Sequence, residues 1–434
     1  MGAAYFNQAV NLLVGVLMVP TLLKFFDPGQ FVLWAIFTTW GGLTLQIESS
    51  IQTVSARRIA REIHGGVPLA PTLNKVRLAY RKLAAMTLGP VAVAGFLFLS
   101  YVAEPKLSTY WAIEWLIFVA AYGVNYWFGI NNAVLLGTDN VETFSYIAAF
   151  TRLVYFVSAL WSLSVGLGVL GVCISFASSV ALNCALMALA ARRALKTNPP
   201  AASISAVETS SSSAAGGIVA YTTYTLAAYA LYKIGVLTAT SFFDKEVVSA
   251  YSLTLQAYTM LSSIALVPIQ ARLSRLVKAL LAGRRQDVIS ELTFTLVTAN
   301  GAFALGTAVL LCFGGDMLNQ IGARVNLPPP LELISVGIAF AIELNLVIFI
   351  NLLVTQQRFR FVKIYVGCVA VALLLAAMSI AAGQPLIRSL VIVPALVQAF
   401  ACLPAVIYLV CAEMGTSPRS VAKAFLQHLK LGRQ

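Results

Sequence analysis

Long apolar runs recur along the whole chain, and short polar breaks separate them. A helix that crosses a bilayer needs roughly 20 mostly apolar residues. Inside hydrocarbon every backbone N–H and C=O group must be bonded within the protein, so runs of this length predict helices. The alternating segments of about 10 residues that are typical of membrane β-barrels do not occur. The pattern predicts an all-α integral membrane protein with about twelve spans, at residues 4–25, 31–54, 83–101, 111–136, 144–164, 167–189, 218–242, 247–269, 292–313, 331–354, 361–382 and 386–411.

The composition excludes a soluble protein. Of the 434 residues, 59% are hydrophobic and only 10% are charged, whereas a soluble domain carries about 25% charged residues. The net charge of +13 is a feature that nucleic-acid-binding proteins share. Here the basic residues concentrate in particular breaks between spans, so we expect the bilayer and not a nucleic acid as the partner.

The basic residues predict an orientation. They cluster after spans 2, 6, 8 and 10 and in the tail, where Val421, Phe425 and Leu429 share one apolar face of a predicted helix. All of these segments fall on one side of a twelve-span protein, and the positive-inside rule then places both termini in the cytoplasm. The clusters are Arg57, Arg58, Arg61, Lys75, Arg77, Arg81 and Lys82; Arg192, Arg193 and Lys196; Arg272, Arg275, Lys278, Arg284 and Arg285; Arg358, Arg360 and Lys363; and Arg419, Lys423, Lys430 and Arg433.

The chain divides into two halves. A Ser/Ala/Pro-rich segment lies near the middle, with six predicted spans on either side, and we interpret it as a linker. An offset of 217 residues carries Phe25-Phe26-Asp27 onto Phe242-Phe243-Asp244 and Arg58 onto Arg275, which indicates an internal duplication. Halves of six spans keep the same orientation, as in parallel-repeat transporters. The expected regions are an N-terminal six-helix bundle (1–196), a cytoplasmic linker (197–215), a C-terminal six-helix bundle (216–412) and a cytoplasmic amphipathic tail (413–434).

The sequence lacks the residues of several enzyme and pump mechanisms. No lysine follows a glycine, so the chain has no phosphate-binding G-K-[ST] loop. His64 and His428 are the only histidines, and the six cysteines form no C-x-x-C pair, which leaves no zinc pattern. We therefore expect neither an enzyme nor a resident metal or cofactor. Coupling to H⁺ or Na⁺ stays open.

Four ionisable residues fall deep within predicted spans: Glu48, Arg152, Lys233 and Glu343. Charged groups in a membrane are costly, so each is a functional hypothesis. Two are anions and two are cations, so mutual pairing within the bundle is an equally simple interpretation. We expect Lys233 and Arg152 to contact an anionic substrate, and Glu48 and Glu343 to act in coupling or charge pairing.

Polar side chains accompany these charges. A stripe of Tyr221, Tyr224, Tyr229 and Tyr232 runs along one face of the seventh span beside Lys233. Such a stripe suits a polar, sugar-bearing, anionic ligand, although plain packing explains it as well. The first span carries Gln8 and Asn11 near its inner end. Amides in spans bind substrates or join helices, and the sequence leaves both open.

The segment from Asn7 to Phe37 resembles the opening of polysaccharide flippases of the O-antigen (Wzx) type, within the multidrug/oligosaccharidyl-lipid/polysaccharide exporter (MOP) superfamily. The resembling features are a polar first helix, Pro20, a very short outer hairpin, and Phe31 and Trp34 at the start of the second helix. The basic stretch SARRIAR from Ser55 is similar to one that those proteins carry. The first helix has no arginine, in contrast to lipid II flippases, and no acidic residue, in contrast to many multidrug antiporters.

The resemblance implies a MATE-like fold and alternating access by two bundles that rock about a central cavity. It implies a flippase for undecaprenyl-diphosphate-linked oligosaccharide in the bacterial inner membrane, acting in surface polysaccharide biosynthesis. We expect a monomer, since both halves of the cavity come from one chain. A polysaccharide polymerase and a chain-length regulator are further candidate partners. The substrate-binding candidates are Lys233, Arg152, Tyr221, Tyr224, Tyr232, Asn11 and Gln8, and Arg58 and Arg275 are expected at the cytoplasmic entrance.

Two alternatives make different predictions. A multidrug or organic-cation antiporter of the same fold would have acidic groups dominating its cavity, whereas the deep charges here are balanced. A membrane-embedded glycan polymerase or ligase would carry a large periplasmic loop with His or Arg, and no such loop is present.

Overall fold

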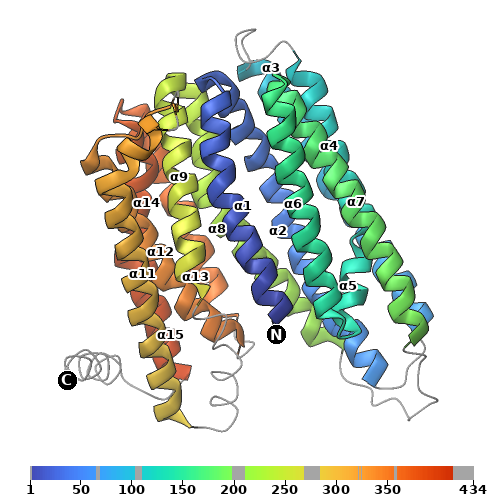
Figure 1. Cartoon of the computed structure of the whole chain (residues 1–434). Helices are drawn as coiled ribbons and strands as arrows, with labels where there is room; N and C mark the ends of the chain where they lie inside the picture. The colour runs from blue at the N-terminus through green and yellow to red at the C-terminus, as the bar shows by residue number, and fades with distance from the viewer. Residues whose placement is uncertain are drawn as a thin grey trace. The chain divides into compact units, whose positions relative to one another are not determined.

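The computed structural model describes residues 2–64, 69–102, 110–197, 211–267, 284–320, 322–323, 325–355 and 359–413. Every regular element in these ranges is helical (Figure 1), which confirms the all-α prediction. The elements are α1 (Gly2–Phe25), α2 (Pro28–His64), α3 (Leu69–Val102), α4 (Trp111–Phe128), α5 (Ile130–Gly137), α6 (Val141–Ser164), α7 (Gly168–Thr197), α8 (Ser211–Phe242), α9 (Lys245–Ala265), α11 (Arg285–Gln320), α12 (Pro330–Thr355), α13 (Phe361–Ala381), η1 (Arg388–Ile392), α14 (Val393–Val397), η2 (Gln398–Cys402) and α15 (Leu403–Glu413).

The helices account for the predicted spans. Over the described residues, eight helices are long and apolar enough to cross a bilayer, and α4 with α5 forms a ninth span. Helices α2, α8 and α9 contain 37, 32 and 21 residues and carry more polar side chains. In chain order, these segments correspond to the twelve spans that the apolar pattern predicts. The protein is therefore a multi-pass membrane protein.

The basic segment after the second span is not the loop that the sequence suggested. Helix α2 continues to His64, and α3 already begins at Leu69. Leu69, Thr72, Val76 and Tyr80 are buried, and their spacing of three to four residues places them on one helix face. Lysine and arginine are good helix formers, so the basic residues occupy the opposite, exposed face of the same helix.

Two further spans differ from the expectation. The fourth span breaks at Gly129, where α4 and α5 meet with a bend of 41°. The last span contains two π-helical turns, η1 and η2, and a proline follows each of them two residues later, at Pro394 and Pro404. Proline lacks an N–H group and clashes with the carbonyl four residues earlier, and a wider turn at that point relieves the conflict.

The chain forms two compact units, each with its own packing. The N-terminal unit comprises Met1–Leu226, Val236–Ser249 and Ile321–Val325, and the C-terminal unit comprises the remaining ranges, so α8 contributes residues to both. In the N-terminal unit α1 packs on α6, α6 on α7, α7 on α4, and α2 on α3 and α5. In the C-terminal unit α12 packs on α11 and α15, and α13 packs on α14.

The first hairpin of each half has the same geometry at the offset of 217 residues. Helices α1 and α8 end at Phe25 and Phe242, and α2 and α9 begin at Pro28 and Lys245. The two turns also have the same backbone hydrogen bonds. In the first turn, Phe26 N donates to Leu22 O at 2.7 Å and Phe31 N donates to Asp27 O at 3.0 Å. In the second turn, the equivalent bonds are Phe243 N to Ala239 O and Val248 N to Asp244 O, both at 3.0 Å.

A second turn repeats at the same offset. Gly166 follows α6 with φ +83°, and Gly383 follows α13 with φ +71°. A glycine in the left-handed region after a helix is the usual C-terminal cap. The amide of Leu167 donates to Ser162 O, and that of Gln384 donates to Ser379 O, both at 3.1 Å. Because turns far apart in each half match residue by residue, the structure supports the internal duplication.

Three predicted features lie wholly or partly outside the described residues. They are Arg275, most of the linker (residues 198–210) and the tail from residue 414. Helix α8 already begins at Ser211, so the last residues of the predicted linker are helical.

Candidate functional site

Glu48 lies on α2 at the centre of a buried polar cluster in the N-terminal unit. Its side chain is only 4% exposed. Asn125 on α4 donates a hydrogen bond from Nδ2 to Glu48 Oε2. One turn earlier on α2, the carbonyl of Thr44 accepts a hydrogen bond of 2.6 Å from the Tyr126 hydroxyl. Two successive residues of α4 thus bind two successive turns of α2.

The break between α4 and α5 lies against this cluster. A Cβ atom built on Gly129 would approach the Tyr80 ring to 2.7 Å and Glu48 Oε1 to 3.1 Å. The backbone at the break can therefore come this close to the Glu48 carboxylate only because residue 129 has no side chain. The Tyr80 hydroxyl is buried and has no hydrogen-bond partner among the described residues.

Arg152 lies on α6 and faces α1. Its Nε donates to Asn11 Oδ1 at 3.0 Å, and Asn11 Nδ2 donates in turn to Asn7 Oδ1 at 3.4 Å. Arg152 is exposed outside these contacts, and no described acidic residue pairs with it. The structure therefore brings together two predicted site residues, Arg152 and Asn11, that are 141 positions apart. Gln8 is half-buried on α1 and forms no hydrogen bond with either of them.

Glu343 lies on α12 within a hydrogen-bonded network of the C-terminal unit. Its Oε1 accepts a bond of 3.1 Å from the Tyr365 hydroxyl, and its Oε2 accepts a bond of 2.6 Å from Gln398 Nε2. The carbonyl oxygen of the Gln398 amide accepts a bond of 2.9 Å from the Tyr232 hydroxyl. The network joins α8, α12, α13 and the π turn η2, and it connects two predicted site residues, Glu343 and Tyr232.

Lys233 is half-buried on α8 next to Tyr232. It has no hydrogen-bond or ion-pair partner among the described residues. The ring of Tyr232 lies 5.0 Å from that of Phe340, so the residue before Lys233 is held by both its ring and its hydroxyl. Nearer the start of α8, the ring centroids of Tyr221 and Tyr224 lie 6.1 Å apart. The tyrosine stripe is divided, because Tyr221 and Tyr224 belong to the N-terminal unit and Tyr232 to the C-terminal unit.

Within each unit, the deep charges do not form the mutual ion pairs that one interpretation proposed. Among the described residues, neither Glu48 nor Glu343 forms an ion pair. Each carboxylate instead accepts a hydrogen bond from an amide side chain, Asn125 or Gln398. The two cations are left without a described acidic partner.

Arg58, which the sequence placed at the cytoplasmic entrance, is exposed near the end of α2. It pairs with Glu62 one turn later at 3.1 Å. This exposed pair is a local helix contact and contributes little to stability.

Sequence reasoning missed two members of these clusters, Gln398 and Tyr365, and one further buried carboxylate, Glu114. Gln398 is the only amide in the apolar run 386–411, and that isolation was a usable signal. Tyr365 gave no signal, because single tyrosines are common in spans. Glu114, on α4, is only 3% exposed, but it lies so near the start of its span that it looked like an interfacial residue.

One pair of asparagines joins two helices of the C-terminal unit to each other. Asn300 on α11 and Asn345 on α12 donate to each other's Oδ1 atoms at 3.0 and 2.9 Å. Reciprocal amide bonds of this kind join helices in a membrane. No group of three or more potential metal ligands occurs among the described residues.

Comparisons with known proteins place the fold. No protein-family profile matches the sequence, and no curated protein matches it. A solved structure described as the inward-facing conformation of a multidrug resistance MATE family transporter of the MOP superfamily is similar, with a TM-score of 0.66 and 10% identity over 95% of this chain and 99% of that one.

Two more solved structures are similar. A MOP superfamily transporter from Pyrococcus furiosus, described as having a binding pocket of reverse polarity, gives a TM-score of 0.59 and 12% identity over 96% of this chain and 95% of that one. The lipid II flippase MurJ in an inward closed conformation gives a TM-score of 0.60 and 10% identity over 98% of this chain and 90% of that one. At these identities the similarity establishes the fold alone: the chain has the MATE-like fold of MOP superfamily transporters and flippases.

Proposed function

We propose that this protein is a flippase that moves undecaprenyl-diphosphate-linked oligosaccharide from the cytoplasmic to the periplasmic leaflet of the bacterial inner membrane. It would act by alternating access and serve surface polysaccharide biosynthesis. The observation that carries the proposal is the state of the four deep charges. Lys233 has no hydrogen-bond or ion-pair partner among the described residues, and the exposed Arg152 bonds only the neutral Asn11 on another helix. Glu48 and Glu343 each accept hydrogen bonds from neutral side chains.

This asymmetry favours an anionic ligand. A cation in a membrane span needs a counter-charge, and it interacts strongly with one because few waters screen the pair. A diphosphate supplies that charge, and guanidinium and ammonium groups bind phosphate through charge-assisted hydrogen bonds. In the proposed mechanism Lys233 is the cation that contacts the diphosphate, and the tyrosines of α8 contact sugar rings. Arg152, which Asn11 orients, is a second candidate for an anionic group of the substrate. The polyprenyl tail stays in the bilayer throughout.

The second candidate is a multidrug or organic-cation antiporter. The solved MATE transporter with the same fold favours it, because that protein is described as a multidrug resistance transporter. A cationic drug would favour a cavity in which acidic groups dominate, however, and the four deep charges here are balanced. The Pyrococcus furiosus protein, whose pocket is described as being of reverse polarity, makes it reasonable that this fold serves substrates of different charge.

The test is leaflet transfer in proteoliposomes. Purified protein is reconstituted with a labelled polyprenyl-diphosphate oligosaccharide, and accessibility of the glycan to an external glycosidase is followed over time. We expect transfer by the wild type, a loss of at least about tenfold in Lys233→Ala, and partial retention in Lys233→Arg, since one lost charge contact costs about 1.4 kcal/mol or more. Lys363→Ala, which removes an exposed lysine on α13, is the matched control.

The possible outcomes separate the function from the site. Equal transfer by the wild type and Lys233→Ala would keep the flippase and reject Lys233 as a substrate contact. Failure of the wild type with every diphosphate glycan, together with proton-dependent uptake of an organic cation, would replace the flippase with the antiporter.

A further inference from the structure

The exposed face of α3 carries a row of cations where the helix leaves its apolar part. Helix α3 is 34 residues long, about 51 Å at 1.5 Å per residue, which exceeds the roughly 30 Å of a hydrocarbon core. No charged residue occurs from Leu83 to Val102, and those twenty residues alone cover about 30 Å. The cations Lys75, Arg77, Arg81 and Lys82 all lie in the part that remains, and all are exposed.

A tryptophan on the neighbouring helix α4 lies beside the point where the apolar part of α3 ends. The guanidinium of Arg81 lies 4.5 Å from the centroid of the Trp127 ring, and Trp127 is 52% exposed at the last turn of α4. Exposed tryptophans concentrate at the boundary between hydrocarbon and headgroups. The apolar length of α3 and the position of Trp127 therefore indicate the same boundary, next to Lys82. From Lys82 to Lys75 the helix rises about 10 Å, which is enough to cross one headgroup layer of about 5–8 Å.

Apolar side chains alternate with the cations on this face. Leu78 is 53% exposed and Met86 is 71% exposed, and at 100° per residue both lie on the same side of α3 as Lys75 and Lys82. Lys75, Arg77 and Lys82 have no acidic partner among the described residues. A nucleic acid or an acidic protein surface would cover the cations but leave Leu78 in water and could not reach Met86, which lies in the apolar part of α3. A phospholipid supplies both a phosphate and an acyl chain.

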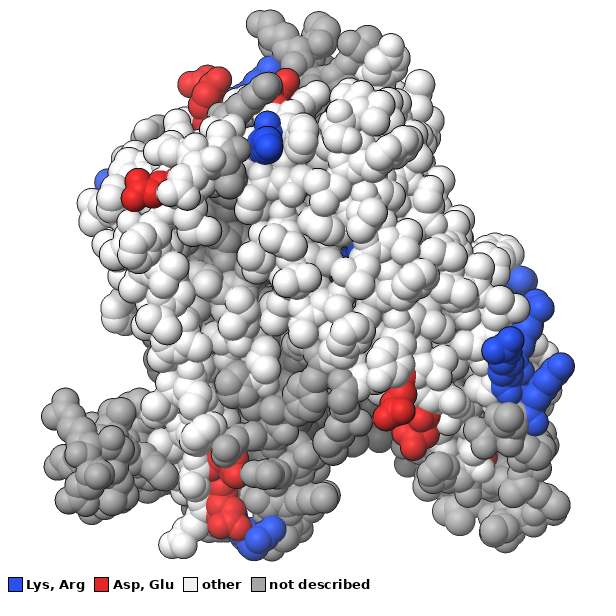
Figure 2. Space-filling model, viewed as in Figure 1, with Lys and Arg blue, Asp and Glu red and all other residues white. Residues whose placement is uncertain are grey.

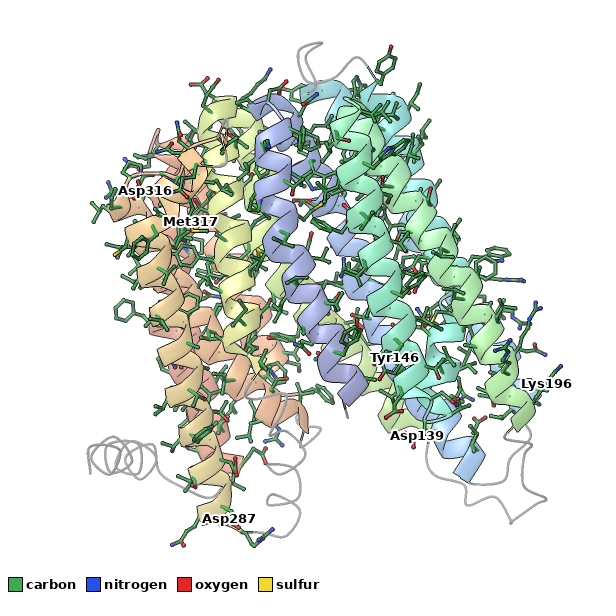
Figure 3. All side chains as sticks on the ribbon, in the orientation of Figure 1. Asp139, Tyr146, Lys196, Asp287, Asp316 and Met317 are labelled. Atoms are coloured by element: carbon green, nitrogen blue, oxygen red, sulfur yellow. The ribbon has the colours of Figure 1, made fainter. Side chains whose placement is uncertain are left out.

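A second helix adds charge at the same end of the N-terminal unit. Ile59, Tyr80, Leu135 and Ala191 belong to one apolar cluster that unites the ends of α2, α3, α5 and α7. Arg192 and Lys196 are exposed on the last turns of α7. Figure 2 shows Lys and Arg side chains gathered at the edge where α7 ends, and Figure 3 labels Lys196 there. The core keeps this end rigid, so the cations are presented on fixed helices.

We propose that this face, formed by Lys75, Arg77, Leu78, Arg81, Lys82 and Trp127, is a binding site for anionic phospholipid headgroups of the adjacent leaflet. The cations bind the lipid phosphates, Trp127 holds the Arg81 guanidinium at the boundary, and Leu78 and Met86 contact the acyl chains. The proposal is independent of what the protein transports.

The test measures lipid binding by purified protein in neutral detergent. Phosphatidylglycerol is titrated, and bound lipid is counted by native mass spectrometry while the unfolding temperature is followed. We expect saturable binding and stabilisation that phosphatidylcholine does not reproduce. In Arg77→Gln/Arg81→Gln/Lys82→Gln the apparent affinity should fall by roughly fivefold for each charge removed, as about 1 kcal/mol for each basic residue near an anionic surface implies.

The control removes the same number of charges elsewhere. Lys24→Gln/Lys245→Gln/Arg388→Gln changes three cations that the sequence predicts on the opposite side of the membrane, and it should bind phosphatidylglycerol like the wild type. If the triple variant folds poorly, Arg81→Gln and Lys82→Gln are measured singly. Equal loss in the control, or unchanged affinity in the α3 variants, would reject the site. Displacement of phosphatidylglycerol by a stoichiometric amount of undecaprenyl phosphate would overturn the choice of lipid, because the face would then be a docking site for polyprenyl phosphates.

Discussion

Gln398 shows how one neutral side chain can organise two functional groups. Its amide donates to Glu343 and accepts from Tyr232, so it links a deep carboxylate to the residue beside Lys233. Because an amide offers both a donor and an acceptor, it can bond to a carboxylate and to a hydroxyl at the same time. The cluster around Glu48 uses an amide in a similar way, because Asn125 donates to the Glu48 carboxylate.

Replacing Gln398 should therefore destabilise the C-terminal unit. Gln398→Leu would remove the donor to Glu343 Oε2 and the acceptor for the Tyr232 hydroxyl. A buried polar group left without its partner costs about 1–3 kcal/mol, so we expect a lower unfolding temperature in detergent. Gln384→Leu, which removes an exposed hydrogen bond to Arg388, is the control. An equal unfolding temperature for the two variants would show that the network contributes no stability.

At the scale of elements, breaks in the helices occur where polar groups gather. The bend at Gly129 lies against Glu48 and Tyr80, and the π turn η2 begins at Gln398. Irregular turns alter the direction of the following side chains, which explains why they recur at functional sites. The deep carboxylates themselves lie on unbroken helices, Glu48 on α2 and Glu343 on α12, and the breaks lie on helices that pack against these two.

Adding a side chain at the bend should disrupt the N-terminal unit. In Gly129→Ala the new Cβ would collide with the Tyr80 ring at 2.7 Å, and the ring cannot move without displacing the buried packing around it. We expect a loss of about 1–3 kcal/mol, seen as a lower unfolding temperature, and partial recovery in Gly129→Ala/Tyr80→Ala.

The control is Gly367→Ala on α13, where a Cβ would meet no atom within 4 Å. Alanine is the better helix former by about 0.5–1 kcal/mol, so this variant should be neutral or stabilised. Unchanged stability of Gly129→Ala would mean that the bend adjusts freely.

At the scale of the molecule, the backbone is duplicated but the polar chemistry is not. The turns after α1 and α6 recur after α8 and α13 at one offset. The same offset places Val16 at the position of Lys233 and Val369 at that of Arg152. The two halves thus share the turns that define the fold but differ in their polar residues. This is expected when two copies of one backbone have taken on different roles.

The distribution of basic residues predicts the topology of the whole chain. Because cytoplasmic segments carry the excess of Lys and Arg, a green fluorescent protein fused after residue 434 or inserted near residue 200 should fluoresce. Alkaline phosphatase inserted between residues 103 and 109 should be active, since that segment is predicted on the opposite side. Active phosphatase fused at the C-terminus would reverse the orientation and with it the proposed direction of transfer.

The sequence alone determined the fold class, the number and order of the spans, the duplication and the identity of the four deep charges. These properties depend on local patterns: apolar length fixes a span, and a repeated turn requires the same residues at one offset. The basic segment before the third span was the exception, because its charges concealed a helix whose buried face follows from the spacing of Leu69, Thr72, Val76 and Tyr80.

Only the tertiary structure decided which partners the deep charges have. Glu48 meets Asn125, Arg152 meets Asn11 and Glu343 meets Gln398 across 77, 141 and 55 residues. Such pairs depend on how each helix is rotated and where it crosses its neighbour, and these are set by the packing of the whole unit and by irregular turns such as those at Gly129 and Gln398. No local pattern contains that information, because a helix face is defined only by the helices that cover it.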